Sequence, residues 1–212
     1  MVTVSMDRAH LGWRFWSAWM AASIISVIVY MMMIPVFFSF IDMLAPTLEF
    51  ESISQDQQWI LQAINFFGMA VLGALIGLAQ WLLLRRYLPR SGWWILATAI
   101  GCIVPMQFGE MFPWRDPPWL GGAIMFMLFG LTLGIAQWFV LRRYMAHSVW
   151  WTAFTLVGWL LAFALTSIAY VTDLYVEPFD LLSAFIVPIG TSGIGMVWLL
   201  RQSPHLSNVR AH

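Results

Sequence analysis

One segment of this chain occurs twice and constrains how the rest can fold. GLAQWLLLRRY at residues 77–87 recurs, with conservative changes only, as GIAQWFVLRRY at residues 134–144. A tryptophan pair at positions 93–94 returns at positions 150–151, with the same offset as the two copies. Fixed spacing of this kind is typical of internal repeats. Each unit predicts a two-helix hairpin that begins at a tryptophan pair and ends at a QWxxLRR segment.

Composition indicates a membrane protein. Of the 212 residues, 61% are hydrophobic and 9% are charged, whereas a soluble domain carries about 25% charged residues. Six apolar runs predict helices that cross a hydrocarbon core about 30 Å thick: residues 15–41, 58–84, 92–109, 119–141, 149–171 and 180–200. The third run is the shortest, but losing it would place the two repeat copies in opposite orientations. We predict a single all-α domain, residues 1–212, with six transmembrane helices.

The repeat divides this domain into three parallel two-helix hairpins. Their expected bounds are about 12–88, 89–145 and 146–202, with a cytoplasmic tail at 203–212. The third unit is degenerate, because Met196 stands where the first two have glutamine. Two helices per unit make the repeats parallel rather than inverted. A closed six-helix bundle with pseudo-threefold symmetry is the expected arrangement.

Charge predicts the orientation in the membrane. All ten basic residues are arginine, and nine lie on one side of the predicted spans: Arg8, Arg14, Arg85, Arg86, Arg90, Arg142, Arg143, Arg201 and Arg210. The acidic residues collect in the opposite loops. By the positive-inside rule the arginine side is cytoplasmic, and both termini lie there. The acidic loops raise the alternative of a cation site, but loops facing water explain them, and we assign no metal site.

A glutamine is the main polar group expected inside the bundle. Gly73, Gly77 and Gln80 share one helix face at 3.6 residues per turn, and the second unit repeats the face with Gln137. Glycines four residues apart allow a neighbouring helix to approach. Gln80 and Gln137 are therefore predicted to tie helices together. The alternative is a polar ring around a ligand pocket.

Four arginines follow the glutamines at headgroup level: Arg85, Arg86, Arg142 and Arg143. We expect them to fix the topology and to contact anionic lipids. A dedicated site for an anionic ligand is the alternative, because the guanidinium fork suits phosphate.

The aromatic residues predict interface belts rather than a cofactor site. Most of the 14 tryptophans, Trp94 and Trp151 among them, fall near a predicted membrane interface, as tryptophan commonly does. A pigment or quinone site lined by tryptophan is the alternative. All four histidines lie in predicted cytoplasmic loops or tails, which argues against a buried haem. Pro188, followed by glycine, threonine and serine, marks the last span as the best candidate for a broken helix.

The QWLLLRR and QWFVLRR segments, each preceded by Gly-x3-Gly and followed by a WW-initiated span, resemble a group of bacterial membrane proteins. These are multi-span proteins with QWxxLRR repeats from cyanobacteria and filamentous anoxygenic phototrophs, and no activity is established for the group. The resemblance covers residues 68–158 closely and the two ends loosely. It implies a protein of the bacterial cytoplasmic membrane and suggests a phototrophic setting.

No residue pattern here predicts catalysis, because the spans carry no charged group near their midplanes and no nucleophile–base pairing is evident. We expect a non-enzymatic structural or accessory membrane protein that is a subunit of a larger membrane complex. If the source is a phototroph, a photosynthetic complex is the expected one. The alternative is a passive binder or carrier of a lipid, isoprenoid or pigment. Membrane lipids and other membrane subunits are the expected partners, without nucleic acid; no cofactor is assigned.

Overall fold

Six α-helices make up the described part of the chain. The computed structural model describes residues 8–44, 58–88, 90–109, 118–172 and 179–202. The helices are α1 (Arg8–Leu44), α2 (Gln58–Leu84), α3 (Trp93–Gly109), α4 (Pro118–Leu141), α5 (Val149–Val171) and α6 (Phe179–Gln202). No strand occurs in these ranges. The all-α class and the six predicted helices are confirmed, although α1 begins earlier than predicted.

Length and composition give most of these helices the properties of membrane spans. Five of them are long and apolar enough to cross a membrane: α1, α2, α4, α5 and α6. The remaining helix, α3, has only 17 residues and is also apolar, in agreement with the short third run of the sequence. The tail predicted at 203–212 lies outside the described residues.

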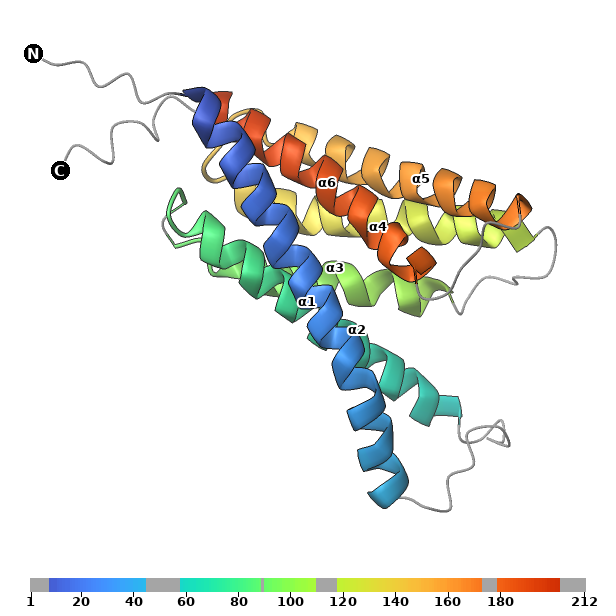
Figure 1. The fold of residues 1–212 in the computed structure, drawn as a ribbon. Coiled ribbons are helices and arrows are strands. Elements are labelled where there is room, and N and C mark those ends of the chain that lie inside the picture. The colour runs from blue at the N-terminus through green and yellow to red at the C-terminus, as the bar shows by residue number, and fades with distance from the viewer. Residues whose placement is uncertain (1–7, 45–57, 89, 110–117, 173–178, 203–212) are drawn as a thin grey trace, which may run out of the picture.

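The helices form a closed cycle of neighbours (Figure 1). Each helix packs against the next one along the chain, and α6 packs against α1. The start of α1, the α2–α3 turn, the α4–α5 turn and the end of α6 lie at the same end of the molecule. Because the QWxxLRR segments end at these two turns, their arginines gather at this end.

Glycines bring α2 against α3 and α4 against α5. A Cβ atom added at Gly77 would lie 2.9 Å from the Cα of Ile95, and one at Gly134 would lie 2.9 Å from the Cα of Thr152. Real Cβ atoms do not approach a neighbouring backbone this closely, so only glycine fits at either position. Both the glycines and the residues they meet occupy equivalent positions of the repeat. The predicted close approach of the glycine faces is thus present in both pairs.

The outer part of α1 leaves the bundle. In Figure 1 the second half of α1 and the first half of α2 diverge together from the other helices. Residues 35–39 of α1 are all exposed. This segment is longer than one helical turn of 3.6 residues, so exposed side chains occur on all sides of it. Val36 and Phe37 are among these side chains, at 70% and 43% exposed.

The last helix is continuous, and the prediction of a break at Pro188 is wrong. α6 runs without interruption through Pro188. The hydroxyl of Thr191 donates to the carbonyl oxygens of Val187 and Pro188, at 3.0 and 3.1 Å. The small residues after the proline provide contacts with α1 instead, because the carbonyl of Gly190 accepts a hydrogen bond from Trp16 Nε1 at 3.0 Å.

Candidate functional site

Three tryptophans meet at the centre of the bundle. Trp19 of α1, Trp94 of α3 and Trp151 of α5 are 0%, 0% and 1% exposed. Their ring centroids are 6.2 Å apart for Trp19–Trp94, 6.2 Å for Trp19–Trp151 and 5.5 Å for Trp94–Trp151, each pair in an edge-to-face arrangement. Edge-to-face packing is favoured by the charge distribution of aromatic rings. We call this cluster the tryptophan triad.

The triad corrects the interface prediction for two of its members. Sequence position placed Trp94 and Trp151 in the interface belt, whereas the structure buries both. Their neighbours Trp93 and Trp150 are 63% and 55% exposed, as expected for belt residues. Adjacent residues on a helix point about 100° apart, so one tryptophan of each pair faces outward and the other faces the core.

The two glutamines join neighbouring helices, each in the same way. Gln80 of α2 accepts a hydrogen bond at Oε1 from Trp94 Nε1, at 3.0 Å, and donates from Nε2 to Ser23 Oγ of α1, at 3.2 Å. Gln137 of α4 accepts from Trp151 Nε1 and donates to Thr98 Oγ1 of α3, both at 3.0 Å. The glutamines are 5% and 4% exposed. Each amide therefore bridges the two helices that flank its own.

The third position of this pattern is filled differently. Trp19 Nε1 donates to Ser192 Oγ of α6, at 3.3 Å, so its acceptor is a hydroxyl rather than an amide. Met196, where the repeat would have glutamine, is completely buried. Thr155 occupies the place on α5 that corresponds to Thr98, and its hydroxyl donates to the carbonyl of Trp151 at 2.9 Å. A methionine cannot donate a hydrogen bond to Thr155, so the α5–α6 pair lacks the amide bridge.

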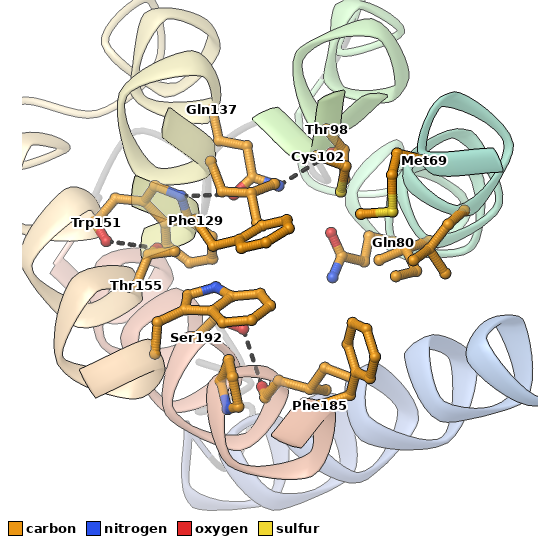
Figure 2. Close-up of a pocket in the computed structure, with 16 residues that line it drawn as sticks. Met69, Gln80, Thr98, Cys102, Phe129, Gln137, Trp151, Thr155, Phe185 and Ser192 are labelled. Carbon is orange, nitrogen blue, oxygen red and sulfur yellow. Dashed lines mark hydrogen bonds between the residues drawn. The ribbon is translucent and has the colours of Figure 1, made fainter. Parts of the chain in front are cut away.

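A small cavity lies beside the triad. Its volume is about 60 Å³, and Figure 2 shows the side chains around it. Its polar lining comes from Gln80, Thr98, Gln137, Thr155 and Ser192, and the rest is apolar or aromatic. One water needs about 10–15 Å³ of such space, whereas drug-sized ligands occupy pockets of about 300–1,000 Å³. The cavity fits a few water molecules and is too small for a lipid tail or a pigment.

The predicted lipid-contacting arginines lie apart from this centre. Arg85, Arg86, Arg142 and Arg143 are all exposed, at the ends of α2 and α4. Arg85 lies over the ring of Trp81, with 5.4 Å between Cζ and the ring centroid, and Arg142 lies over Trp138 at the same distance. These contacts hold both guanidinium groups at the rim of the bundle. The arginines and the glutamines therefore form two separate sites.

The chemistry of the buried centre is hydrogen bonding between neutral groups. Neither the triad nor the cavity lining contains a carboxylate, histidine or lysine. Within the part of the chain that the structure describes, no three His, Cys, Asp or Glu side chains lie close enough together to hold a metal ion. Cys102 is a free, buried thiol in the cavity wall. The acidic loop residues considered for a cation site fall outside the described side chains.

Sequence reasoning found the glutamines but missed their partners. Ser23, Thr98 and Thr155 each follow a triad tryptophan by four residues, so hydroxyl and indole lie on one helix face. Thr98 and Thr155 are at equivalent positions of the repeat, and Ser23 takes the same place after Trp19. This W-x3-S/T spacing is the signal that could have located the site.

Comparisons of the chain with protein-family models, with curated proteins and with solved structures find no match.

Replacement of Gln137 by leucine is expected to lower the free energy of unfolding by about 0.6–2 kcal/mol. The substitution removes the acceptor of Trp151 and the donor to Thr98, and it leaves the buried indole N–H without a partner. Unfolding by sodium dodecyl sulfate in mixed micelles measures the change. Gln80→Leu should give a similar loss, since its contacts are equivalent. Unchanged stability in both variants would contradict the role of the glutamines as ties between helices.

Proposed function

We propose that this chain is a non-enzymatic integral membrane protein with a structural or accessory role. Its six helices cross the bacterial cytoplasmic membrane as three parallel hairpins, with both termini and the arginine-rich turns in the cytoplasm. It acts by packing against other membrane components, as a subunit of a larger complex. The resemblance to QWxxLRR proteins of phototrophs makes a photosynthetic complex the first candidate.

The repeated contacts support the three-hairpin arrangement. The hydrogen bonds of Gln80 and Gln137 are equivalent, and the tryptophan triad takes one residue from each odd-numbered helix. Gly77 and Gly134 meet equivalent positions on α3 and α5. Equal contacts at equal spacing are expected when one two-helix unit occurs several times around an axis. The remaining position keeps the tryptophan, in Trp19, but replaces the amide.

The orientation rests on charge. The arginines of the α2–α3 and α4–α5 turns lie at the end of the bundle where α1 begins and α6 ends. Such a cluster is retained in the cytoplasm during membrane insertion. Fusion of a reporter enzyme to either turn tests this, because alkaline phosphatase is active only outside the cytoplasm and should stay inactive there.

The observation that carries the structural role is the pairing of the buried polar groups with one another. The indoles and amides of the centre use their hydrogen bonds within the protein, and only about 60 Å³ of space is left beside them. A binding pocket for a lipid or pigment would have a far larger volume, with polar groups free to contact the ligand. The centre is therefore built to hold helices together.

The uncovered part of α1 supports an accessory role. A helix that is apolar on all faces needs either lipid or another protein around it. Residues 35–39 are all exposed, and Phe67, on the diverging part of α2, is 63% exposed. This arm offers a surface on which a second membrane protein can pack.

Native isolation tests the proposal. The full chain is purified from its own membrane in a mild detergent, with a photo-reactive amino acid at Val36 in one sample and at Leu160 of α5, also exposed, in the other. We expect a stoichiometric membrane partner that cross-links at Val36 but not at Leu160. A monomer without a partner would count against a structural role. Mass spectrometry that finds one tightly held isoprenoid or pigment would favour the carrier alternative.

A further inference from the structure

The turn between α2 and α3 forms a shallow depression with features that the helix ties do not explain. Its volume is about 600 Å³. Its lining combines basic, hydroxyl and aromatic side chains: Trp81, Arg85, Arg90, Ser91, Gly92, Trp93 and Leu96. The α2–α3 turn lies at the end of the bundle where α1 begins and α6 ends (Figure 1). It is separate from the central cavity, with which it shares no lining residue.

Positive charge dominates this depression. Arg85 and Arg90 both line it, and both are exposed. Arg85 is held over the ring of Trp81, which fixes its guanidinium at the edge of the depression. Two guanidinium groups that line one depression favour an anionic ligand.

Ser91 supplies an independent sign of a missing partner. Its side chain is 1% exposed, and its hydroxyl has no hydrogen-bond partner in the structure. Ser91 also lines the depression. A buried hydroxyl without a partner is rare in native proteins, and it points to a group that the protein alone does not supply. A phosphate oxygen is a strong acceptor for such a hydroxyl.

The backbone of the turn favours an anion in the same place. α3 begins at Trp93, so the positive end of its dipole lies at this turn, although the N–H groups of Trp94 and Ile95 already donate to the carbonyls of Ser91 and Gly92. Arg90 adopts a positive φ of 62°, which is unusual for a residue with a side chain. This conformation brings Arg90 and Ser91 into the wall of one depression instead of continuing a helical path.

We propose that the α2–α3 turn is a binding site for a phosphate group carried by an anionic phospholipid of the cytoplasmic leaflet. Arg85 and Arg90 pair with the phosphate oxygens, and Ser91 donates to them. Trp93 and Leu96 are 63% and 48% exposed and lie beside the acyl chains. That a lipid supplies the phosphate depends on the proposed orientation in the membrane. That the turn binds phosphate depends only on the residues of the turn.

The second turn explains why one site is expected rather than two. Arg142 and Ser148 correspond to Arg85 and Ser91 in the repeat, but His147 stands in the place of Arg90. Histidine lacks the guanidinium fork with which arginine pairs with phosphate. The α4–α5 turn therefore carries two arginines, Arg142 and Arg143, where the α2–α3 turn carries three, Arg85, Arg86 and Arg90. We expect lipid selectivity to come from the first turn.

The test uses the full chain in nanodiscs that contain phosphatidylglycerol or phosphatidylcholine, with the number and affinity of retained lipids measured by native mass spectrometry. Arg85→Gln and Arg90→Gln should each weaken phosphatidylglycerol retention about fivefold or more. Arg86→Gln is the matched control, because Arg86 is an exposed neighbour that does not line the depression. It should change retention by less than about twofold.

Ser91→Ala separates binding from folding. Since Ser91 Oγ has no hydrogen-bond partner among the described residues, the substitution should leave the melting temperature in phosphatidylcholine unchanged, yet weaken phosphatidylglycerol retention. Equal losses for Arg85→Gln and Arg86→Gln would overturn the proposal, since general attraction would then explain the binding. If inorganic phosphate stabilises the protein but phosphatidylglycerol is retained no better than phosphatidylcholine, the site binds free phosphate and the lipid part of the proposal is wrong. None of these outcomes depends on finding a protein partner.

Discussion

Replacement of Trp151 by alanine is expected to lower the free energy of unfolding by about 3–5 kcal/mol, the usual cost of removing a large buried aromatic side chain. Trp151 is 1% exposed and contacts both other members of the tryptophan triad. The substitution opens a cavity at the bundle centre. It also removes the donor to Gln137 Oε1, so a buried acceptor loses its partner. The two costs act in the same direction.

Trp150 provides the matched control for this experiment. It is the same residue type, one position earlier, and is 55% exposed. Trp150→Ala should change stability by less than about 1 kcal/mol, as expected for exposed positions. Unfolding in mixed micelles, followed by far-ultraviolet circular dichroism, measures both variants. Similar losses for the two variants would show that the interface belt, not the triad, stabilises the bundle.

Glutamine at position 196 should be tolerated, although glutamine at position 199 should not. Met196 and Leu199 are both completely buried on α6. By the repeat, a glutamine in place of Met196 can donate to Thr155 and accept from Trp19, as Gln137 does with Thr98 and Trp151. Met196→Gln should stay within about 1 kcal/mol of the original stability, because the amide is satisfied and nearly the same volume is kept.

Leu199→Gln places the same amide where the repeat offers it no partners. A buried polar group without hydrogen bonds costs about 1–3 kcal/mol by protein mutational measurements, and lost packing adds to this. The difference in melting temperature between the two glutamine variants is the readout. If Met196→Gln is as damaging as Leu199→Gln, the third hairpin does not share the geometry of the first two.

The helices and the polar faces could be predicted from the sequence because local periodicity determines them. Apolar runs of membrane-spanning length predicted the six helices. The spacing of Gly73, Gly77 and Gln80 placed them on one face, and the structure packs that face closely against α3. Both signals depend on residues within a few turns of one helix, so the local sequence is enough to predict the helix and its polar face.

The partners of the glutamines could not be predicted with the same rule. Tryptophan near a helix end is common at a membrane interface, and only the packing of three distant helices decides that Trp94 faces inward while Trp93 faces outward. The divergence of the outer part of α1 is likewise a property of the whole assembly of helices. The break predicted at Pro188 was wrong for a related reason. The nearby residues Gly190 and Ser192 accept hydrogen bonds from tryptophans of α1, and this contact between distant helices is not visible in the local sequence.

The unequal lengths of α1 and α3 have a consequence for the surrounding bilayer. The apolar part of α1 has 28 residues and the whole of α3 has 17 residues, which correspond to about 42 Å and about 26 Å of helix. A hydrocarbon core is about 30 Å thick, so one helix is too long for it and the other too short. If both helices cross the membrane as proposed, the lipids beside α3 are expected to be compressed, and α1 is expected to tilt or to thicken the bilayer around it. The protein is thereby expected to sit in the membrane as a wedge that imposes a thickness gradient on its lipid annulus.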